Sequence, residues 1–221
     1  MTTTEASASV PRTLSTRRLE AFTDGVFAIA ATLLVLNLSV DAIGSVNSNA
    51  ELWHALVEQG PAIQSFVISF LLLGLLWSLH VRQFEYIIAV DSIMIWLNII
   101  RLLGVVFVPF ATSLNSGYSD YLIGQMVLPV TFLFVIVFGT WQWYYATTPA
   151  RHLLQPHTDP AFVSANRIGG IVAVITGIIV VALSAFVGSY AFLLFALGPL
   201  GTRLARLASR GRTHKTGPHD S

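Results

Sequence analysis

The 221-residue sequence contains no cysteine, and only 10% of its residues are charged. Without cysteine the chain forms no disulfides, no thiolate metal sites and no thiol-based active site. A soluble domain usually carries about 25% charged residues, so this chain has too few to cover a surface that faces water. Hydrophobic residues make up 54% of it instead, and the mean hydropathy is +0.71. The composition predicts an all-α membrane protein whose exterior faces lipid.

Several motifs of catalysis and transport are also missing. The sequence has no P-loop for a nucleotide-driven pump, no H-E-x-x-H and no G-x-S-x-G. Its histidines lack the spacing of metal ligands, and no T-V-G-Y-G filter of ordinary potassium channels occurs. We therefore predict no catalytic residues, no metal site, no cofactor and no enzymatic activity.

Long apolar runs are the main feature that is present. A helix needs roughly 20 mainly apolar residues to cross a bilayer, and six windows qualify. They are residues 19–40, 62–79, 86–110, 121–144, 162–187 and 189–204, of which the last is the shortest. The first run lacks a signal-peptide cleavage pattern, so we expect it to be a retained helix. The polar connection 41–60 ends at Gly60-Pro61, which indicates a helix start.

The basic residues lie on one side of these predicted spans, with the exception of Arg101 inside the third. They are Arg12, Arg17, Arg18, Arg82, Arg151, Arg167, Arg203, Arg206, Arg210, Arg212 and Lys215. The opposite loops contain acidic residues but no lysine or arginine. By the positive-inside rule both termini are predicted to be cytoplasmic, in a multi-pass protein of the cell membrane.

Polar side chains within the apolar runs are costly in lipid and mark candidate sites. Arg18 and Asp24 are six residues apart and do not stack on one helix face, so each is expected to pair with another helix. His80 is predicted at the depth of Asp24, where it either joins a His–Asp or Arg–Asp network or faces the headgroups. Asn98 is expected to form an interhelical hydrogen bond. Arg101 either snorkels outward or pairs with an acidic group, and the sequence leaves both open.

One face of the first run carries an apolar stripe. Phe22, Ile29, Leu33 and Leu36 follow one another at spacings of seven, four and three residues, and Thr32 borders them. Such a stripe usually packs against other helices or faces lipid. Spacing alone therefore favours packing over a pore-lining role.

Residues 18–24, R-L-E-A-F-T-D, resemble the R-x-x-x-F-S-D signature of the transmembrane protein 175 family. Thr23 stands where the family usually has serine, and it keeps the hydroxyl. Further similarities are the continuation 25–36, the W-x-x-H of residues 77–80, the L-N of residues 97–98 and the V-P-F that ends at residue 110. The family comprises endolysosomal potassium channels of animals and single-repeat relatives in bacteria.

The resemblance implies a pore lined by the first helix and surrounded by four six-helix repeats. Because this chain has one repeat, a homotetramer is expected. Carried over, Ile29 forms the apolar constriction, Leu33 and Leu36 form rings further outward, and Thr32 forms a hydroxyl layer tied to cation preference. The channel domain is expected over residues 17–207, between a disordered cytoplasmic N-terminus of residues 1–16 and a basic cytoplasmic tail of residues 208–221.

The resemblance also implies a structural network that holds the first helix. Its expected members are Arg18, Phe22, Thr23, Asp24, Trp77, His80 and Asn98. The expected function is passive, potassium-selective conduction, with potassium as the permeant ion, membrane lipid and further copies of the chain as partners, and no nucleic acid. The alternatives are a small secondary transporter, for which Asp91 and Arg101 are the only candidate coupling residues, and a non-conducting scaffold.

Overall fold

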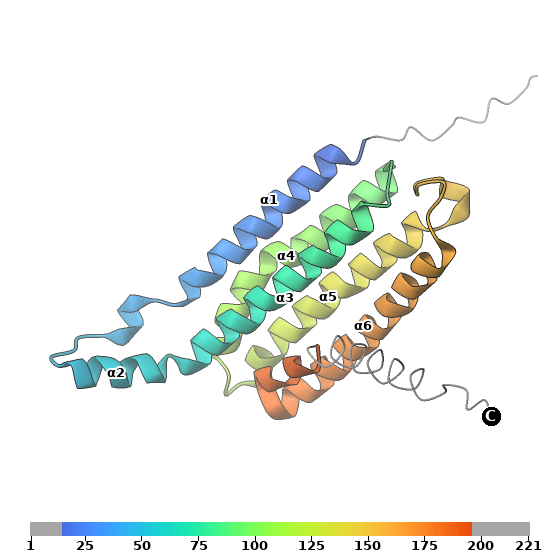
Figure 1. The fold of residues 1–221 in the computed structure, drawn as a ribbon. Coiled ribbons are helices and arrows are strands. Elements are labelled where there is room, and N and C mark those ends of the chain that lie inside the picture. Colours follow the sequence, from blue (N-terminus) through green and yellow to red (C-terminus); the bar gives the residue numbers. More distant parts are fainter. Residues whose placement is uncertain (1–14, 196–221) are drawn as a thin grey trace, which may run out of the picture.

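The structure is a computed structural model that describes residues 15–195, and within this range it is built from helices. Five of them are long and apolar enough to cross a membrane. They are α1 (Arg17–Leu33, extended by a 3₁₀ turn, Leu34–Asn37), α3 (Gly60–Phe84), α4 (Ser92–Gly117), α5 (Leu122–Ala146) and α6 (Pro160–Val187). They run side by side with alternating direction, and α1 and α6 lie at opposite edges of the bundle (Figure 1). They correspond to the first five predicted spans.

Two helix ends differ from the predicted ones. Residues 86–91 were predicted to be helical, but Ile87 forms a bridge with Leu154 and α4 begins only after Asp91. The Asp91 carboxylate accepts a hydrogen bond from the Met94 backbone N–H at 2.9 Å, which caps the helix. At the end of α3 the helix continues to Phe84, so Arg82 lies in its last turn and not in a loop.

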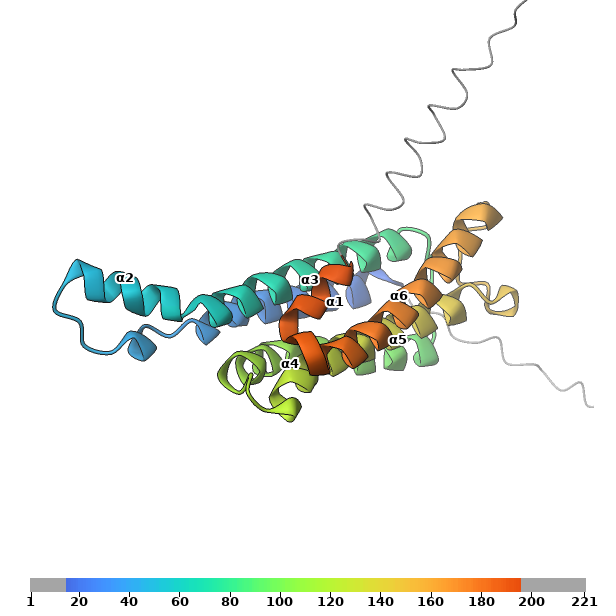
Figure 2. The same ribbon diagram turned by 90° about the horizontal axis from the view of Figure 1, so that it is seen from below.

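The connection between α1 and α3 contains a helix that the sequence did not predict. This helix, α2 (Asn49–Glu58), is capped by Ser48, whose hydroxyl accepts from the Glu51 N–H at 3.2 Å. The Glu51 carboxylate in turn accepts from the Asn47 N–H at 2.7 Å, which is a reciprocal capping arrangement. None of the residues of α2 is buried, and the helix extends beyond the end of the bundle (Figures 1 and 2).

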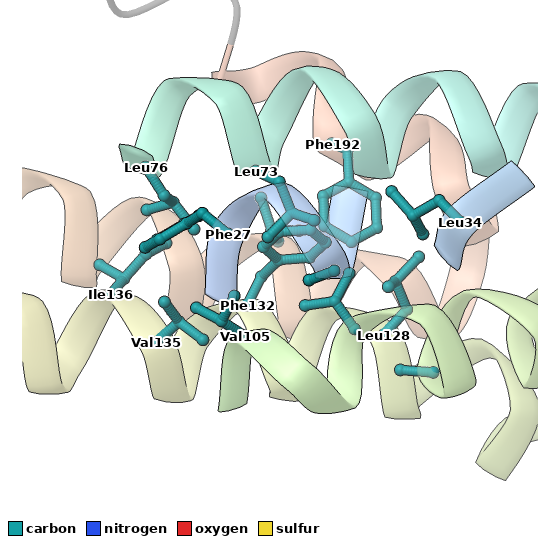
Figure 3. Close-up of a cluster of buried hydrophobic side chains, with 14 of the residues drawn as sticks. Phe27, Leu34, Leu73, Leu76, Val105, Leu128, Phe132, Val135, Ile136 and Phe192 are labelled. Carbon is teal, nitrogen blue, oxygen red and sulfur yellow. The ribbon is translucent and has the colours of Figure 1, made fainter. Parts of the chain in front are cut away.

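The central helices are α4 and α5. Half of the most apolar window of α4 and 44% of that of α5 are buried, against 28% for α1 and 17% for α6. Their shared core with α1 and α3 contains Phe27, Leu73, Val105 and Phe132 (Figure 3). At Gly104 a Cβ would come within 2.7 Å of Phe134 and Val135, so the small residue lets α4 approach α5 closely.

After α6 the chain reverses at Gly188, whose φ of 56° favours glycine. A 3₁₀ turn (Gly188–Phe192) follows, and the Phe192 ring packs edge-on against Phe132 with centroids 5.7 Å apart. Most of the sixth predicted span, residues 196–204, lies outside the described residues, as do residues 1–14 and the tail of residues 208–221.

Candidate functional site

The first helix, α1, has one buried face and one exposed face. Its buried residues are Leu19, Thr23, Phe27 and Ala30, and Leu34 continues the same face into the 3₁₀ turn. Their spacing of three or four residues makes one continuous stripe, which packs against α3 and α4. The helix is therefore held to the bundle along a single side.

The predicted apolar stripe lies on the exposed side of α1. Ile29 is 62% exposed, Leu33 39% and Leu36 71%, and Thr32 and Phe22 are exposed too. The Thr32 hydroxyl donates to the Ile29 carbonyl at 2.8 Å, which leaves its oxygen available as an acceptor. No other element within residues 15–195 covers this stripe.

A buried polar network joins α1 to the other helices. The Thr23 hydroxyl accepts from Asn98 Nδ2 at 2.8 Å, and Asn98 Oδ1 accepts from Gln142 Nε2 at 3.1 Å. Gln142 Oε1 accepts from Arg101 Nη1 at 3.3 Å, and the same Nη1 lies 3.1 Å from His80 Nδ1. Each of the five residues is at most 2% exposed. The network thus links α1, α4, α5 and α3 without a break.

The Arg101 guanidinium is the centre of this network. Its Nη2 donates to the Leu76 carbonyl of α3 at 3.3 Å, and its Cζ lies 5.9 Å from the centre of the Phe27 ring. Because arginine only donates, His80 Nδ1 must be the acceptor of the 3.1 Å contact. Interhelical hydrogen bonds in membranes contribute about 0.6–2 kcal/mol each. The network therefore contributes more to selecting one packing arrangement of the helices than to the free energy of unfolding.

Asp24 lies outside this network. It accepts a hydrogen bond from Trp77 Nε1 of α3 at 2.8 Å, and both side chains are exposed. Within the described residues Asp24 thus pairs with Trp77 and not with a histidine or an arginine, because His80 faces Arg101 on the buried side. Asp24 and Trp77 line a cavity of about 360 Å³ between α1 and α3, together with Phe70 and Gly74.

The structure gathers some of the predicted network residues and leaves others apart. Thr23, His80 and Asn98 are brought together, and Asp24 and Trp77 form a separate pair. Arg18 and Phe22 are exposed and form no hydrogen bond or ion pair within the described range. Their positions on α1 do not connect them to the network.

The sequence did not point to Gln142 as a member of the network, and it left the partner of Arg101 open. Gln142 lies near the end of its apolar run, where a polar residue attracts no notice, yet it is 1% exposed. Arg101 was expected either to snorkel or to pair with a carboxylate. It does neither, because it is 2% exposed and no carboxylate within residues 15–195 forms an ion pair with it.

The two candidate coupling residues of a transporter both have structural contacts. The Asp91 carboxylate caps α4 and also accepts from the Tyr145 hydroxyl at 2.5 Å. Arg101 is held by three hydrogen bonds. At the other end of the bundle, Ser69 and Thr112 share a hydrogen bond of 2.8 Å between α3 and α4.

Comparison with known proteins gives a consistent result. A family model described as the endosomal/lysosomal potassium channel TMEM175 matches residues 18–109. A potassium channel of Streptomyces collinus is 34% identical over 68% of this chain and 73% of its own length. The endosomal/lysosomal proton channel TMEM175 of Gallus gallus is 38% identical over 48% of this chain and 22% of its own length.

A solved structure resembles the fold as well. The crystal structure of a lysosomal potassium-selective channel TMEM175 homolog from Chamaesiphon minutus superimposes with a TM-score of 0.70 at 27% identity. The match covers 82% of this chain and 94% of that one. These findings confirm the resemblance seen in residues 18–24. The chain belongs to the TMEM175 family, whose members are ion channels and not enzymes.

Proposed function

We propose that this protein is a potassium-selective channel of the cell membrane, in which four copies of α1 surround the pore. The observation that carries the proposal is the exposed apolar stripe of Ile29, Leu33 and Leu36, on the side of α1 opposite its buried anchor. A helix held along one side offers its other side to a central axis. The potassium-channel names of the bacterial relatives support the choice of ion.

Four apolar side chains around an axis form a barrier by dehydration. Such a ring offers an ion no replacement for its water, so a narrow ring dewets and blocks conduction, while a wider one passes a partly hydrated ion. Ile29 is the proposed constriction, with Leu33 and Leu36 as further rings. Potassium loses less than sodium on shedding water because it is more weakly hydrated, and the acceptor oxygen of Thr32 offsets part of the cost.

The buried network has a mechanical part in this proposal. A constriction works only if each copy of α1 is held at a fixed rotation about its own axis. Thr23 is about 1.7 turns from Ile29, and its bond to Asn98 ties that rotation to α4. The Asp24–Trp77 bond adds a second tie, to α3. We assign these residues a positioning role and not contact with the ion.

The assembly and orientation complete the proposal. One repeat supplies one pore helix, so a closed four-fold ring needs a homotetramer. The distribution of arginine and lysine supports cytoplasmic termini on either side of a channel domain of residues 17–207. A secondary transporter is less well supported, since Asp91 caps a helix and Arg101 lies in the network.

Ion flux in liposomes tests the pore assignment. Purified protein is reconstituted with potassium inside and sodium outside, and flux is compared for wild type and Ile29→Asn. We expect roughly tenfold or higher flux in the variant, because an amide ring holds water where an isoleucine ring excludes it. The matched control is Ile175→Asn, since Ile175 is 51% exposed against 62% for Ile29 and lies on α6, at the edge of the bundle opposite α1 (Figure 1).

The outcomes separate the candidate functions. Equal flux for wild type and both variants would refute the pore role of Ile29. A wild-type protein that conducts no ions in any condition would favour the alternative of a non-conducting scaffold. A pH-sensitive dye in the lumen distinguishes potassium from proton conduction, which matters because the Gallus gallus relative is named a proton channel. The mass of the assembly in detergent tests the tetramer independently.

A further inference from the structure

Arg101 carries a buried positive charge that no carboxylate among residues 15–195 neutralises. It is 2% exposed, and within the described part of the chain its side-chain partners are the neutral His80 ring and the Gln142 amide. A charge inside a membrane protein is costly unless it is paired. Within residues 15–195 this cost is not offset, and an anion bound beside Arg101 would offset it.

The guanidinium has one unused edge. Of the five N–H donors that arginine carries, the bonds to His80, Gln142 and the Leu76 carbonyl use three. The Nε–H has no partner among the described residues, Nε and Nη2 lie on one edge of the guanidinium, and the Leu76 carbonyl uses one of the two Nη2 hydrogens. This is the edge with which arginine grips a phosphate or a carboxylate through two parallel hydrogen bonds.

A cavity of about 320 Å³ lies beside Arg101, between α3 and α6 and over α5. Gly139 lines it next to the free edge: a Cβ at this position would stand 3.1 Å from Nε and 3.5 Å from Nη2. The missing side chain lets the guanidinium lie close to α5 beside the cavity, and Nε itself is buried. The cavity also exposes polar groups of Gln83, Thr140 and Asn166.

We propose that the cavity between α3, α5 and α6 binds a phosphate-bearing anion, with Arg101 as its charge partner. The amide of Gln83 and the second amide N–H of Asn166, whose first donates to the Phe162 carbonyl, supply further donors to the phosphate oxygens. Leucine and isoleucine side chains make up much of the remaining wall, so the cavity suits a group that is anionic at one end and apolar at the other. Two sources have this chemistry: the phosphodiester of a membrane phospholipid and free inorganic phosphate.

The site is separate from the proposed ion path. None of the residues that line the cavity belongs to α1, and the apolar stripe lies on the opposite edge of the bundle (Figure 1). Binding can thus be measured on the purified protein without any assay of conduction. Loss of the pore assignment would leave this proposal standing.

The test measures binding by native mass spectrometry and thermal unfolding of delipidated protein in neutral detergent. The probes are phosphatidylglycerol, phosphatidylcholine, diacylglycerol, and sodium phosphate against sodium chloride at equal ionic strength. We expect the two phospholipids to bind saturably and diacylglycerol to bind at least roughly tenfold more weakly, which corresponds to one charge-assisted contact.

Substitutions at Gly169 locate the site. A Cβ at Gly169 meets nothing within 4 Å, and the residue lines the cavity. Gly169→Phe should fill the cavity without disturbing the helices and weaken phospholipid binding roughly tenfold. Gly169→Ala, the matched control, should leave binding unchanged. Arg101→Gln should weaken binding to a similar extent. If this variant does not fold, the comparison of Gly169→Phe with Gly169→Ala still tests the proposal.

Each outcome has one meaning. Phospholipid binding that Gly169→Phe weakens supports a lipid phosphate, while stabilisation by sodium phosphate alone, lost in Gly169→Phe, supports a free anion. Equal binding of diacylglycerol overturns the proposal, because the phosphate would then contribute nothing. Binding of every probe that is identical in Gly169→Phe and Gly169→Ala overturns it as well.

Discussion

The outer stripe of α1 and the polar network behind it contrast in both polarity and exposure. Ile29 and Leu36 are apolar and more than half exposed, while Asn98 and Arg101 are polar and at most 2% exposed. A water-soluble protein has the opposite distribution. The contrast shows that lipid, and not water, surrounds much of this bundle.

The same contrast separates two structural tasks. The network residues satisfy one another, so their hydrogen bonds specify one arrangement of four helices. The stripe residues have no partner within residues 15–195, so substitutions there should change what the surface contacts and not how the chain folds. Each of the following predictions tests one side of this division.

The largest effect is expected for Gln142→Leu. This change leaves Asn98 Oδ1 and one Arg101 donor without a partner in a buried site. We expect the free energy of unfolding, measured in mixed micelles of mild detergent and dodecyl sulfate, to fall by about 3 kcal/mol. Gln64→Leu is the control, since Gln64 is half-buried and has no hydrogen bond among the described residues.

A loss of stability in Gln142→Leu no larger than in the control would show that the network is dispensable for the fold. The contrast between the buried and the exposed side would then have no energetic basis.

A smaller effect is expected for Thr23→Val, which keeps the shape and removes the hydroxyl that accepts from Asn98. We expect a loss of about 1 kcal/mol, because one buried donor loses its partner. Thr23→Ser keeps the hydroxyl and should stay within about 0.5 kcal/mol of wild type. The same micelle assay checks both, and equal losses would assign the effect to the methyl group and not to the hydrogen bond.

Trp77→Phe should reduce stability by about 0.5 kcal/mol, because its bond to Asp24 is exposed and polar groups left there can be solvated. Asp24→Ala removes the acceptor and serves as its partner variant. The double variant should cost no more than the larger single change if the two residues act through one bond. Additive losses would show that they act separately.

The smallest effect on folding is expected for Leu36→Ala on the outer stripe. Leu36 is 71% exposed, so the free energy of unfolding of the monomer should change by less than about 0.5 kcal/mol. Potassium flux in liposomes should nevertheless rise, since a smaller side chain widens the proposed ring. A stability loss comparable to that of Gln142→Leu would contradict the proposed difference between the exposed stripe and the buried network.

The apolar runs were sufficient to predict five spans, because a lipid-spanning helix must be long and uniformly apolar. Local sequence patterns were not sufficient to predict the shorter helix or the helix ends. The helix α2 was missed because its ten residues are too short for a span, and its start depends on side-chain contacts of Ser48 and Glu51. The start of α4 was placed too early because residues 86–90 are apolar enough to continue a span, while Asp91 caps the helix.

The sequence alone determined the membrane setting, the family resemblance in residues 18–24 and the polar residues that deserved notice. It did not determine their partners, because a hydrogen bond between helices depends on their rotation and depth. Only the tertiary structure decided that Asp24 pairs with Trp77, and that Arg101 joins His80 and Gln142 without a carboxylate. It also decided that the stripe of Ile29, Leu33 and Leu36 stays uncovered, since packing along one face of α1 leaves the other face free.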